Sequence, residues 1–360
     1  MNLKKLSLII LAGALLLSTN SCKDDDEVTV SPSLDGYLSF SAPAFIKPGT
    51  TITMTPVGVS HPDDEGVGYY WKVSPTMTKY DTTRFENGLD KYGKPSDGSF
   101  THTFSDTLQT YSVYAYAYAK GYSSSSSSNY CTVVSGGLEE SITNLYIIRN
   151  ASGDEEIDDK VFYYTTVGGN DWLMTNITKP GAGAPYYNCS AMSDVFGRYY
   201  NYEDAQKVCP EGWTLPTDAD WVALAKAAGA DQSAEVHTNI NGVAAALMGN
   251  AYFNDTRMWE YWPAVGDITN NTGMSIIPTG YAMLGDLNAN PKTDPNIEYS
   301  YPNAIFKGCY EYAAIWTADT VADEEDMAYY RYFICNQPNM MIGKADQKTF
   351  GAAVRCIRKK

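Results

Sequence analysis

The sequence predicts an all-β sandwich followed by a larger α+β domain. Short segments of strand-like residues, separated by Gly, Pro and Asp clusters, fill residues 34–134. Helix-start patterns appear in residues 145–358 and are followed by further strand-like segments. The chain has 360 residues, of which 44% are hydrophobic and 19% charged, so it can bury a core in each domain.

The N-terminus has the pattern of a bacterial lipoprotein signal. Lys4 and Lys5 precede an apolar run over residues 6–17, and small polar residues lead to Cys22. The run is too short to persist as a membrane-spanning helix. The segment before Cys22 resembles a lipobox, in which the cysteine is acylated and becomes the new N-terminus. We therefore expect removal of residues 1–21 and lipidation of Cys22; the alternative is an ordinary secretory signal with an incidental cysteine.

The acidic residues after this cysteine point to the cell surface. Residues 23–27 read Lys-Asp-Asp-Asp-Glu and resemble the tag that sends lipoproteins to the outer face of some Gram-negative bacteria. Loss of residues 1–21 removes two lysines and changes the net charge from −16 to −18. We expect an outer-membrane lipoprotein exposed at the surface, with residues 22–33 as its tether. A simple solvated spacer is the other interpretation of the acidic run.

Composition excludes several classes of function. Only 26 Lys and Arg stand against 42 Asp and Glu, which disfavours a surface for nucleic acid or for anionic lipid. The three histidines, His61, His102 and His237, are far apart in the sequence, so no catalytic triad is indicated. No phosphate-binding glycine pattern is present. We expect no cofactor and no metal, and contact with the membrane through the N-terminal lipid alone.

Six further cysteines are expected in an oxidising compartment, where such residues are often bridged. Six cysteines allow 15 pairings, and no CxxC spacing favours zinc or a redox motif. They are Cys131, Cys189, Cys209, Cys309, Cys335 and Cys356. The residues alone leave the pairing open.

The first domain is predicted to contain about seven short strands, which favours a sandwich. Residues 123–128 are expected to form the last solvent-facing strand, because β-type residues follow them, and residues 135–144 are expected to be the linker. Other strands are expected at 38–40, 51–54, 69–73, 99–104 and 111–116. The strand of Trp71 and the strands at 99–104 and 113–121 resemble PKD-like immunoglobulin modules of bacterial surface proteins. That resemblance implies a core position for Trp71.

The second domain is predicted to begin with helices. Asn201 is expected to cap a short helix over 202–208. Residues 217–220, Thr-Asp-Ala-Asp, form a capping box for a helix that Gly229 ends. A third helical stretch is expected at 243–248, and strands at 274–277, 313–316, 329–335 and 352–357. Helices followed by strands indicate an α+β layout and not a repeated βαβ pattern.

Five motifs of this domain resemble the FISUMP (major paralogous) domain family. They lie in the family's order at residues 161–176, 209–217 with Trp221 after it, 278–281, 314–317 and 353–357. Asp171, Thr175 and Asp220 depart from the family pattern, which has Gln, Glu and Glu there. The resemblance implies a C-type-lectin-like fold, export from the cell and no common activity. It also implies a disulfide between Cys209 and Cys356, which occupy the family's paired positions.

The sequence disfavours two kinds of chemistry that are known in such folds. Residues 337–339, Gln-Pro-Asn, resemble the sugar-coordinating tripeptide of calcium-dependent lectins, but they follow the strand of Trp316 and the lectin motif precedes it. We expect a turn there, and a solvated loop at the acidic residues 323–326. Formylglycine-generating enzymes share the architecture and need a reactive cysteine pair. Cys309 and Cys335 are the candidates, but bridging or burial of each is the favoured interpretation.

Aromatic residues in the loops are the favoured binding surface, because aromatic faces stack on sugar rings. The candidates precede the Trp316 strand and are Trp259, Tyr261, Trp262, Tyr299 and Tyr301. Tyr186, Tyr187 and the segment 310–312 add further rings; packing under loops is the alternative for each. We expect a non-catalytic binding or adhesion module for an extracellular glycan or a partner surface protein. The alternatives are a structural subunit of a cell-surface assembly and, after it, an enzyme of formylglycine-generating-like architecture.

Overall fold

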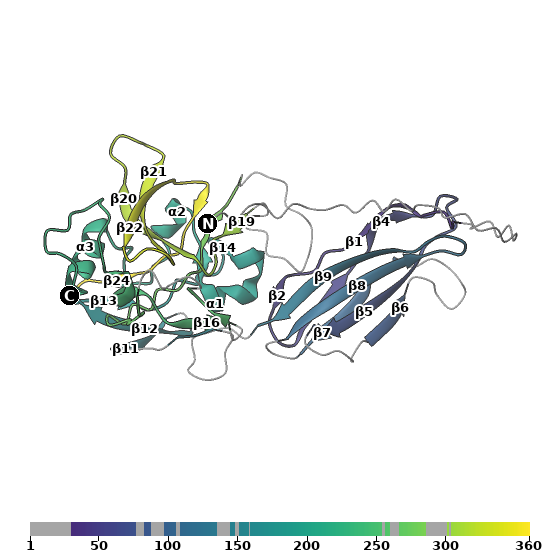
Figure 1. Ribbon diagram of the computed structural model, residues 1–360, viewed down its shortest axis with the longest axis horizontal. Coiled ribbons are helices and arrows are strands. Elements are labelled where there is room, and N and C mark those ends of the chain that lie inside the picture. The colour runs from purple at the N-terminus through teal and green to yellow at the C-terminus, as the bar shows by residue number, and fades with distance from the viewer. Residues whose placement is uncertain are drawn as a thin grey trace, which may run out of the picture.

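The computed structural model describes residues 30–76, 83–87, 97–105, 109–134, 145–147, 151–157, 159–253, 256–259, 266–285, 301 and 304–360. The described chain is elongated, with an all-β part at one end and a larger, mostly β part with short helices at the other (Figure 1). Among these residues no helix has the length and hydrophobicity of a membrane span. Cys22, the predicted leader over residues 1–21 and the predicted linker over residues 135–144 lie outside the described residues.

The N-terminal part is built on a five-stranded sheet. Its order is β2 (Phe45–Ile46), β9 (Ser125–Val133), β8 (Thr110–Tyr118), β5 (Gly68–Pro75) and β6 (Thr83–Asn87). Two antiparallel pairs accompany it: β3 (Thr50–Met54) with β7 (Phe100–Phe104), and β1 (Asp35–Ser39) with β4 (Val57–Ser60). The predicted serine-rich last strand is confirmed as β9.

Alternation along these strands places one core inside the N-terminal part. On β8, Val113, Ala115 and Ala117 are fully buried. Trp71 on β5 is also fully buried, and its indole Nε1 donates a hydrogen bond of 2.9 Å to the carbonyl oxygen of Gly98. Its ring stacks on Phe100 with centroids 5.5 Å apart. The predicted core role of Trp71 is confirmed.

The described residues of the C-terminal part form five small sheets. They are β11 (Gly153–Ile157), β12 (Lys160–Val167), β13 (Asn170–Leu173) and β24 (Ile357–Arg358); β20 (Tyr312–Thr320), β21 (Met327–Ile334) and β22 (Met341–Asp346); β19 (Ile305–Lys307), β18 (Tyr281–Met283) and β23 (Phe350–Gly351); β10 (Leu145–Ile147), β16 (Ala251–Phe253) and β17 (Thr256–Arg257); and β14 (Ala184–Pro185) with β15 (Arg198–Tyr199). The pairing of β13 with β24 brings the final strand beside the first sheet.

The expected order of helices first and strands afterwards is wrong, because the meander β11–β13 precedes the helices. Gly168 and Gly169 both have positive φ, 61° and 85°, and form the tight turn between β12 and β13. Glycine adopts this conformation without steric cost, so the Gly-Gly pair lets the two strands fold back on each other. This turn signal lies inside the first family motif.

The helices are short. They are the 3₁₀ turns η1 (Tyr186–Asn188) and η2 (Ser190–Met192), followed by α1 (Ser193–Phe196), α2 (Tyr202–Ala205), α3 (Asp218–Ala227) and α4 (Ala244–Leu247). The capping box of α3 is confirmed: the Thr217 side chain accepts from the Asp220 amide, and the Asp220 carboxylate accepts from the Thr217 amide. Asn201 caps α2 as predicted, but the helix ends at Ala205 and does not reach the predicted end at residue 208. The amide of Lys207 donates to the carbonyl oxygen of Asp204, three residues earlier, which is a 3₁₀-type bond and not an α-helical one.

Residues 274–277 do not form the expected strand. Ser275 has a φ of 51°, which interrupts the extended backbone, and its amide donates to the Asn270 side chain. Ile276 makes only an isolated bridge to Met248. The predicted strand at 313–316 is confirmed as part of β20, and the one at 329–335 is confirmed over residues 329–334 of β21, after which Cys335 lies in a turn.

A disulfide joins Cys209 to Cys356, as the family resemblance implied. It closes a loop of 147 residues, which on the chain-entropy model contributes about 5 kcal/mol to the free energy of unfolding. Cys131, Cys189 and Cys335 are buried cysteines outside any disulfide, and Cys309 is a partly buried one.

The two parts meet in a packed joint. The ring of Phe45, from β2, lies 6.0 Å from Tyr186 and 6.4 Å from Phe253 of the C-terminal part. Next to it, Lys47 forms an ion pair of 2.9 Å with Asp194. The parts therefore share an apolar contact and a charge contact in addition to their covalent connection.

Candidate functional site

Two of the predicted ligand-binding rings are structural, which corrects the sequence interpretation. Trp259 is fully buried in the core of the C-terminal part, and its indole Nε1 donates to the carbonyl oxygen of Ile276 at 3.1 Å. Tyr301 is 5% exposed, and its hydroxyl accepts from Asn201 and donates to Asp204. Neither ring can present a face to a ligand. Both rings are buried and not exposed to a ligand, and burial is favourable because each polar ring atom makes a hydrogen bond inside the protein.

Tyr261, Trp262 and Tyr299 lie outside the described residues. Of the other rings considered, Tyr186 belongs to the joint between the two parts and Tyr187 is 52% exposed beside it. Tyr312, from the segment 310–312, has a different place. It lines a pocket.

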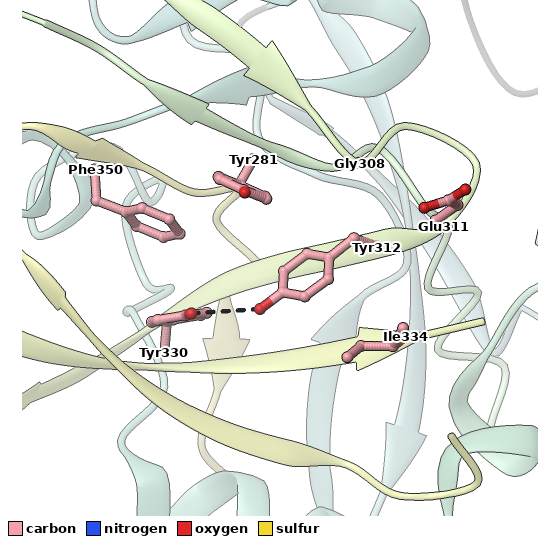
Figure 2. A pocket seen from close by; sticks show the side chains of 7 residues that line it. All are labelled: Tyr281, Gly308, Glu311, Tyr312, Tyr330, Ile334 and Phe350. Atoms are coloured by element: carbon pink, nitrogen blue, oxygen red, sulfur yellow. Dashed lines mark hydrogen bonds between the residues drawn. The ribbon is translucent and has the colours of Figure 1, made fainter. Parts of the chain in front are cut away.

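The pocket has a volume of about 440 Å³ and lies where two of the small sheets meet. Tyr281 begins β18, Tyr312 begins β20 and Phe350 begins β23. The described residues that line it are Tyr281, Gly308, Glu311, Tyr312, Tyr330, Ile334 and Phe350, drawn in Figure 2. Tyr330 and Ile334 come from β21, and Gly308 and Glu311 from the turn between β19 and β20.

Glycine backbone sets the edge of the pocket. Gly308 has a φ of 72°, and a Cβ added there would lie 2.8 Å from the Cβ of Tyr312. Gly280, in the family motif at 278–281, has a φ of 81°, and its added Cβ would lie 2.1 Å from the carbonyl oxygen of Lys307. Its amide donates to the carbonyl oxygen of Tyr312 at 2.6 Å. These close approaches join β18 to β20 and so place Tyr281 beside Tyr312.

The aromatic rings form one connected group around the pocket. Tyr281 meets Tyr312 edge to face, with centroids 5.3 Å apart, and stacks on Phe350 at 5.4 Å. Phe350 in turn lies 4.8 Å from Tyr330. The hydroxyls of Tyr312 and Tyr330 are 3.3 Å apart and share a hydrogen bond. Mutual packing therefore fixes the rings before any ligand arrives.

The pocket offers neutral phenols and one carboxylate. Burial raises the pKa of Tyr312 and of Tyr330, so both hydroxyls stay protonated at neutral pH and can donate and accept hydrogen bonds. Glu311 is exposed and is the one acidic side chain among the described lining residues. No lysine or arginine is among them. The arrangement can hold a ligand by ring stacking and hydroxyl contacts.

The calcium-lectin tripeptide is a structural turn, as expected. Residues 337–339 connect β21 to β22, the Asn339 side-chain oxygen accepts from the Gly242 amide, and the Pro338 carbonyl accepts from Ala244. In the acidic turn after β20, Glu324 pairs with Lys344. Within the described ranges no group of three His, Cys, Asp or Glu side chains is placed to hold a metal ion.

The two cysteines considered for catalysis have structural surroundings. Cys335 is 4% exposed and belongs to the main core cluster. Burial raises the pKa of the Cys309 thiol to about 12, although hydrogen bonds to Tyr186 and Tyr310 oppose that shift. Because the thiolate is the nucleophile, a thiol of this kind is unreactive near neutral pH.

Sequence reasoning missed Tyr281, Tyr330 and Phe350 as members of one site. Tyr281 was visible as the last residue of the motif at 278–281, and the run Tyr329-Tyr330-Arg331-Tyr332 was visible as part of a strand. No local sequence pattern indicates that β18, β20, β21 and β23 lie next to one another, because they are far apart along the chain.

Comparison with known proteins gives one family. Residues 148–358 match the family described as the Fibrobacter succinogenes major domain. Among solved structures, two of superoxide reductase (neelaredoxin) from Ignicoccus hospitalis show a weak likeness, with 14% and 15% sequence identity and a TM-score of 0.22 for each. Each match covers 28% of this chain and 82% of the other chain. No curated protein matches the sequence.

Proposed function

The chain belongs to the Fibrobacter succinogenes major domain family, and from that premise we propose that it is a non-catalytic binding module that holds a glycan outside the cell. The family motifs flank the pocket. Tyr281 is inside the motif at 278–281, Tyr312 lies two residues before the motif at 314–317, and Phe350 lies three residues before the motif at 353–357.

The pocket of Tyr281, Tyr312, Tyr330 and Phe350 is the observation that carries the proposal. Its volume of about 440 Å³ is in the usual range for small-ligand sites, roughly 300–1,000 Å³. A sugar presents apolar C–H faces and a rim of hydroxyls. The tyrosine and phenylalanine rings can stack on the C–H faces, and the phenol hydroxyls and the Glu311 carboxylate can form hydrogen bonds with the sugar hydroxyls.

The finer architecture belongs to the same proposal. The sheets around buried Trp71 support a PKD-like, immunoglobulin-type spacer, and the loop-rich C-terminal part with its two capped helices supports a C-type-lectin-like domain. Cleavage before Cys22 and acylation of Cys22 would anchor the protein in the outer membrane, since several acyl chains hold a protein durably where one does not. Loss of membrane partitioning in Cys22→Ala would support the anchor, and retention would oppose it.

A glycan-array screen of residues 30–360, followed by calorimetry on each hit, tests the binding function. Tyr312→Ala should weaken binding about tenfold or more, because it removes a ring face worth about 0.5–1.5 kcal/mol beyond area burial and the hydroxyl contact with it. Tyr330→Phe keeps the ring, so it should fold normally and lose only the hydroxyl contribution.

The matched control is Tyr130→Ala, which removes a tyrosine that is 63% exposed on β9 of the N-terminal part. It should leave affinity unchanged, and a chelator should have no effect on the wild type. An array without hits, or hits that Tyr312→Ala and Tyr330→Phe bind as the wild type does, would oppose the proposal. Binding that a chelator abolishes would favour a calcium-dependent site instead.

A further inference from the structure

We infer that the pocket takes an amino sugar whose amine is protonated, with the ammonium group held between the Glu311 carboxylate and the tyrosine rings. The inference rests on the proposed glycan binding and adds the charge of the ligand. Three features of the described site support it: a carboxylate without an ion-pair partner, a set of aromatic faces, and a lining that contains no lysine or arginine.

The carboxylate of Glu311 has no cationic partner among the described residues, although ion pairs link many other acidic side chains of the C-terminal part. Its backbone is held firmly. The Glu311 amide donates to the Gly308 carbonyl at 3.1 Å, and the Glu311 carbonyl accepts from the Cys335 amide at 2.8 Å. The backbone of Glu311 is therefore fixed at the edge of the pocket, and in the described part of the chain its carboxylate has no counter-ion, which a bound ammonium group would supply.

The rings attract the same charge. Aromatic faces carry negative quadrupole charge, and a cation within about 6 Å of a ring centroid is stabilised by it. In Figure 2, Tyr312 lies between Glu311 on one side and Tyr330 and Phe350 on the other. A cation next to Tyr312 would thus meet a ring and a carboxylate together, whereas an N-acetyl group is neutral and gains neither charge contact.

An anionic sugar does not fit this site. No lysine or arginine is among the described lining residues, and the chain has a net charge of −16. A uronic acid or a sialic acid would bring a carboxylate next to Glu311 with nothing to neutralise the pair. A neutral sugar could use Glu311 as a hydrogen-bond acceptor only, and this is the alternative that the experiment must separate.

The test compares the trimer of glucosamine with the trimer of N-acetylglucosamine by calorimetry at slightly acidic pH, where the amines are protonated. The wild type should bind the glucosamine trimer about tenfold more tightly, a difference of about 1.4 kcal/mol. Glu311→Gln keeps the shape of the side chain and should bring the two affinities together, because the glucosamine trimer loses its charge contact and the N-acetylated trimer has none to lose. Raising the salt from about 50 mM to about 500 mM should also reduce the preference.

Glu211→Gln is the matched control, because Glu211 is an exposed acid of the same part and does not line the pocket. A preference that both variants retain equally would mean general attraction by the acidic surface and would overturn the inference. Equal affinity of the wild type for the two trimers, or an anionic array hit that depends on Tyr312, would overturn it while leaving glycan binding intact. Failure of every glycan to bind would overturn both.

Discussion

Replacing Asp218 by Asn should destabilise the C-terminal part strongly, because it breaks a buried ion pair. The Asp218 carboxylate receives two hydrogen bonds from Arg331, at 2.6 Å from Nε and 2.8 Å from Nη2, and both side chains are fully buried. The same carboxylate accepts from the His237 amide at 2.6 Å. The pair therefore links α3, β21 and the loop that follows α3.

The expected cost follows from what the substitution leaves behind. Asn keeps the shape of Asp218 but leaves the Arg331 guanidinium buried without a counter-charge, and removal of one partner of such a pair costs about 3–5 kcal/mol. At about 2–4 °C per kcal/mol for a part of this size, the melting temperature should fall by roughly 6–20 °C. Urea unfolding followed by far-UV circular dichroism gives the free energy directly.

The matched control is Glu324→Gln, which breaks an ion pair of the same length, 2.6 Å to Lys344, between side chains that are 45% and 43% exposed. Surface pairs contribute about 0–1 kcal/mol, so this variant should unfold almost as the wild type does. The double variant Asp218→Asn with Arg331→Met also removes the buried, unpaired guanidinium, so it should recover part of the lost free energy of unfolding. Equal costs for Asp218→Asn and Glu324→Gln would refute the reasoning.

Three further outcomes are expected. Cys209→Ser should lower the free energy of unfolding by about 5 kcal/mol under non-reducing conditions. A reductant should have no further effect on this variant. Free thiols at Cys209 and Cys356 in protein from the exported fraction would contradict the bridge. Native Cys309, whose thiol pKa burial raises to about 12, should resist iodoacetamide at pH 8 and react once urea unfolds the chain; mass spectrometry of the labelled peptide decides. Burial raises the pKa of Asp171, but hydrogen bonds from Lys360, Thr166 and Arg358 outweigh it and hold that pKa below its usual value of 3.8. The contribution of Asp171 to the free energy of unfolding is thus complete above pH 3.8 and is lost as the pH falls through the folded-state pKa of Asp171. Asp171→Asn should therefore make the stability less dependent on pH in this acidic range. An unchanged pH dependence in the variant would contradict this prediction.

Local chemistry made parts of the fold predictable. The capping box of Thr217 and Asp220 and the cap at Asn201 are fixed by residues within one turn, so both could be identified from the sequence. The bridge between Cys209 and Cys356 was accessible through the family motifs, because nothing local brings together residues 147 positions apart.

The site was less accessible, because a ring's residue type does not say whether it is buried. Trp259 and Tyr312 both follow loop-like sequence. Trp259 can be buried because its indole nitrogen donates a hydrogen bond to the carbonyl oxygen of Ile276. Tyr312 stays half-buried because the close backbone contacts at Gly308 and Gly280 place it where two sheets meet. Those contacts come from pairings across the chain, which a single sequence does not display.

The covalent loop closed by Cys209 and Cys356 has a mechanical consequence. All described lining residues of the pocket, from Tyr281 to Phe350, lie inside that loop. If the N-terminus is held and a bound glycan pulls on the pocket, tension that reaches Cys209 crosses the disulfide to Cys356, which is six residues from Phe350. Without the bridge the same tension could pull out the chain between Cys209 and the pocket, up to the 141 residues that lead to Phe350, or about 480 Å of contour length. The bridge thus makes the part of the molecule that holds the pocket short and inextensible under load.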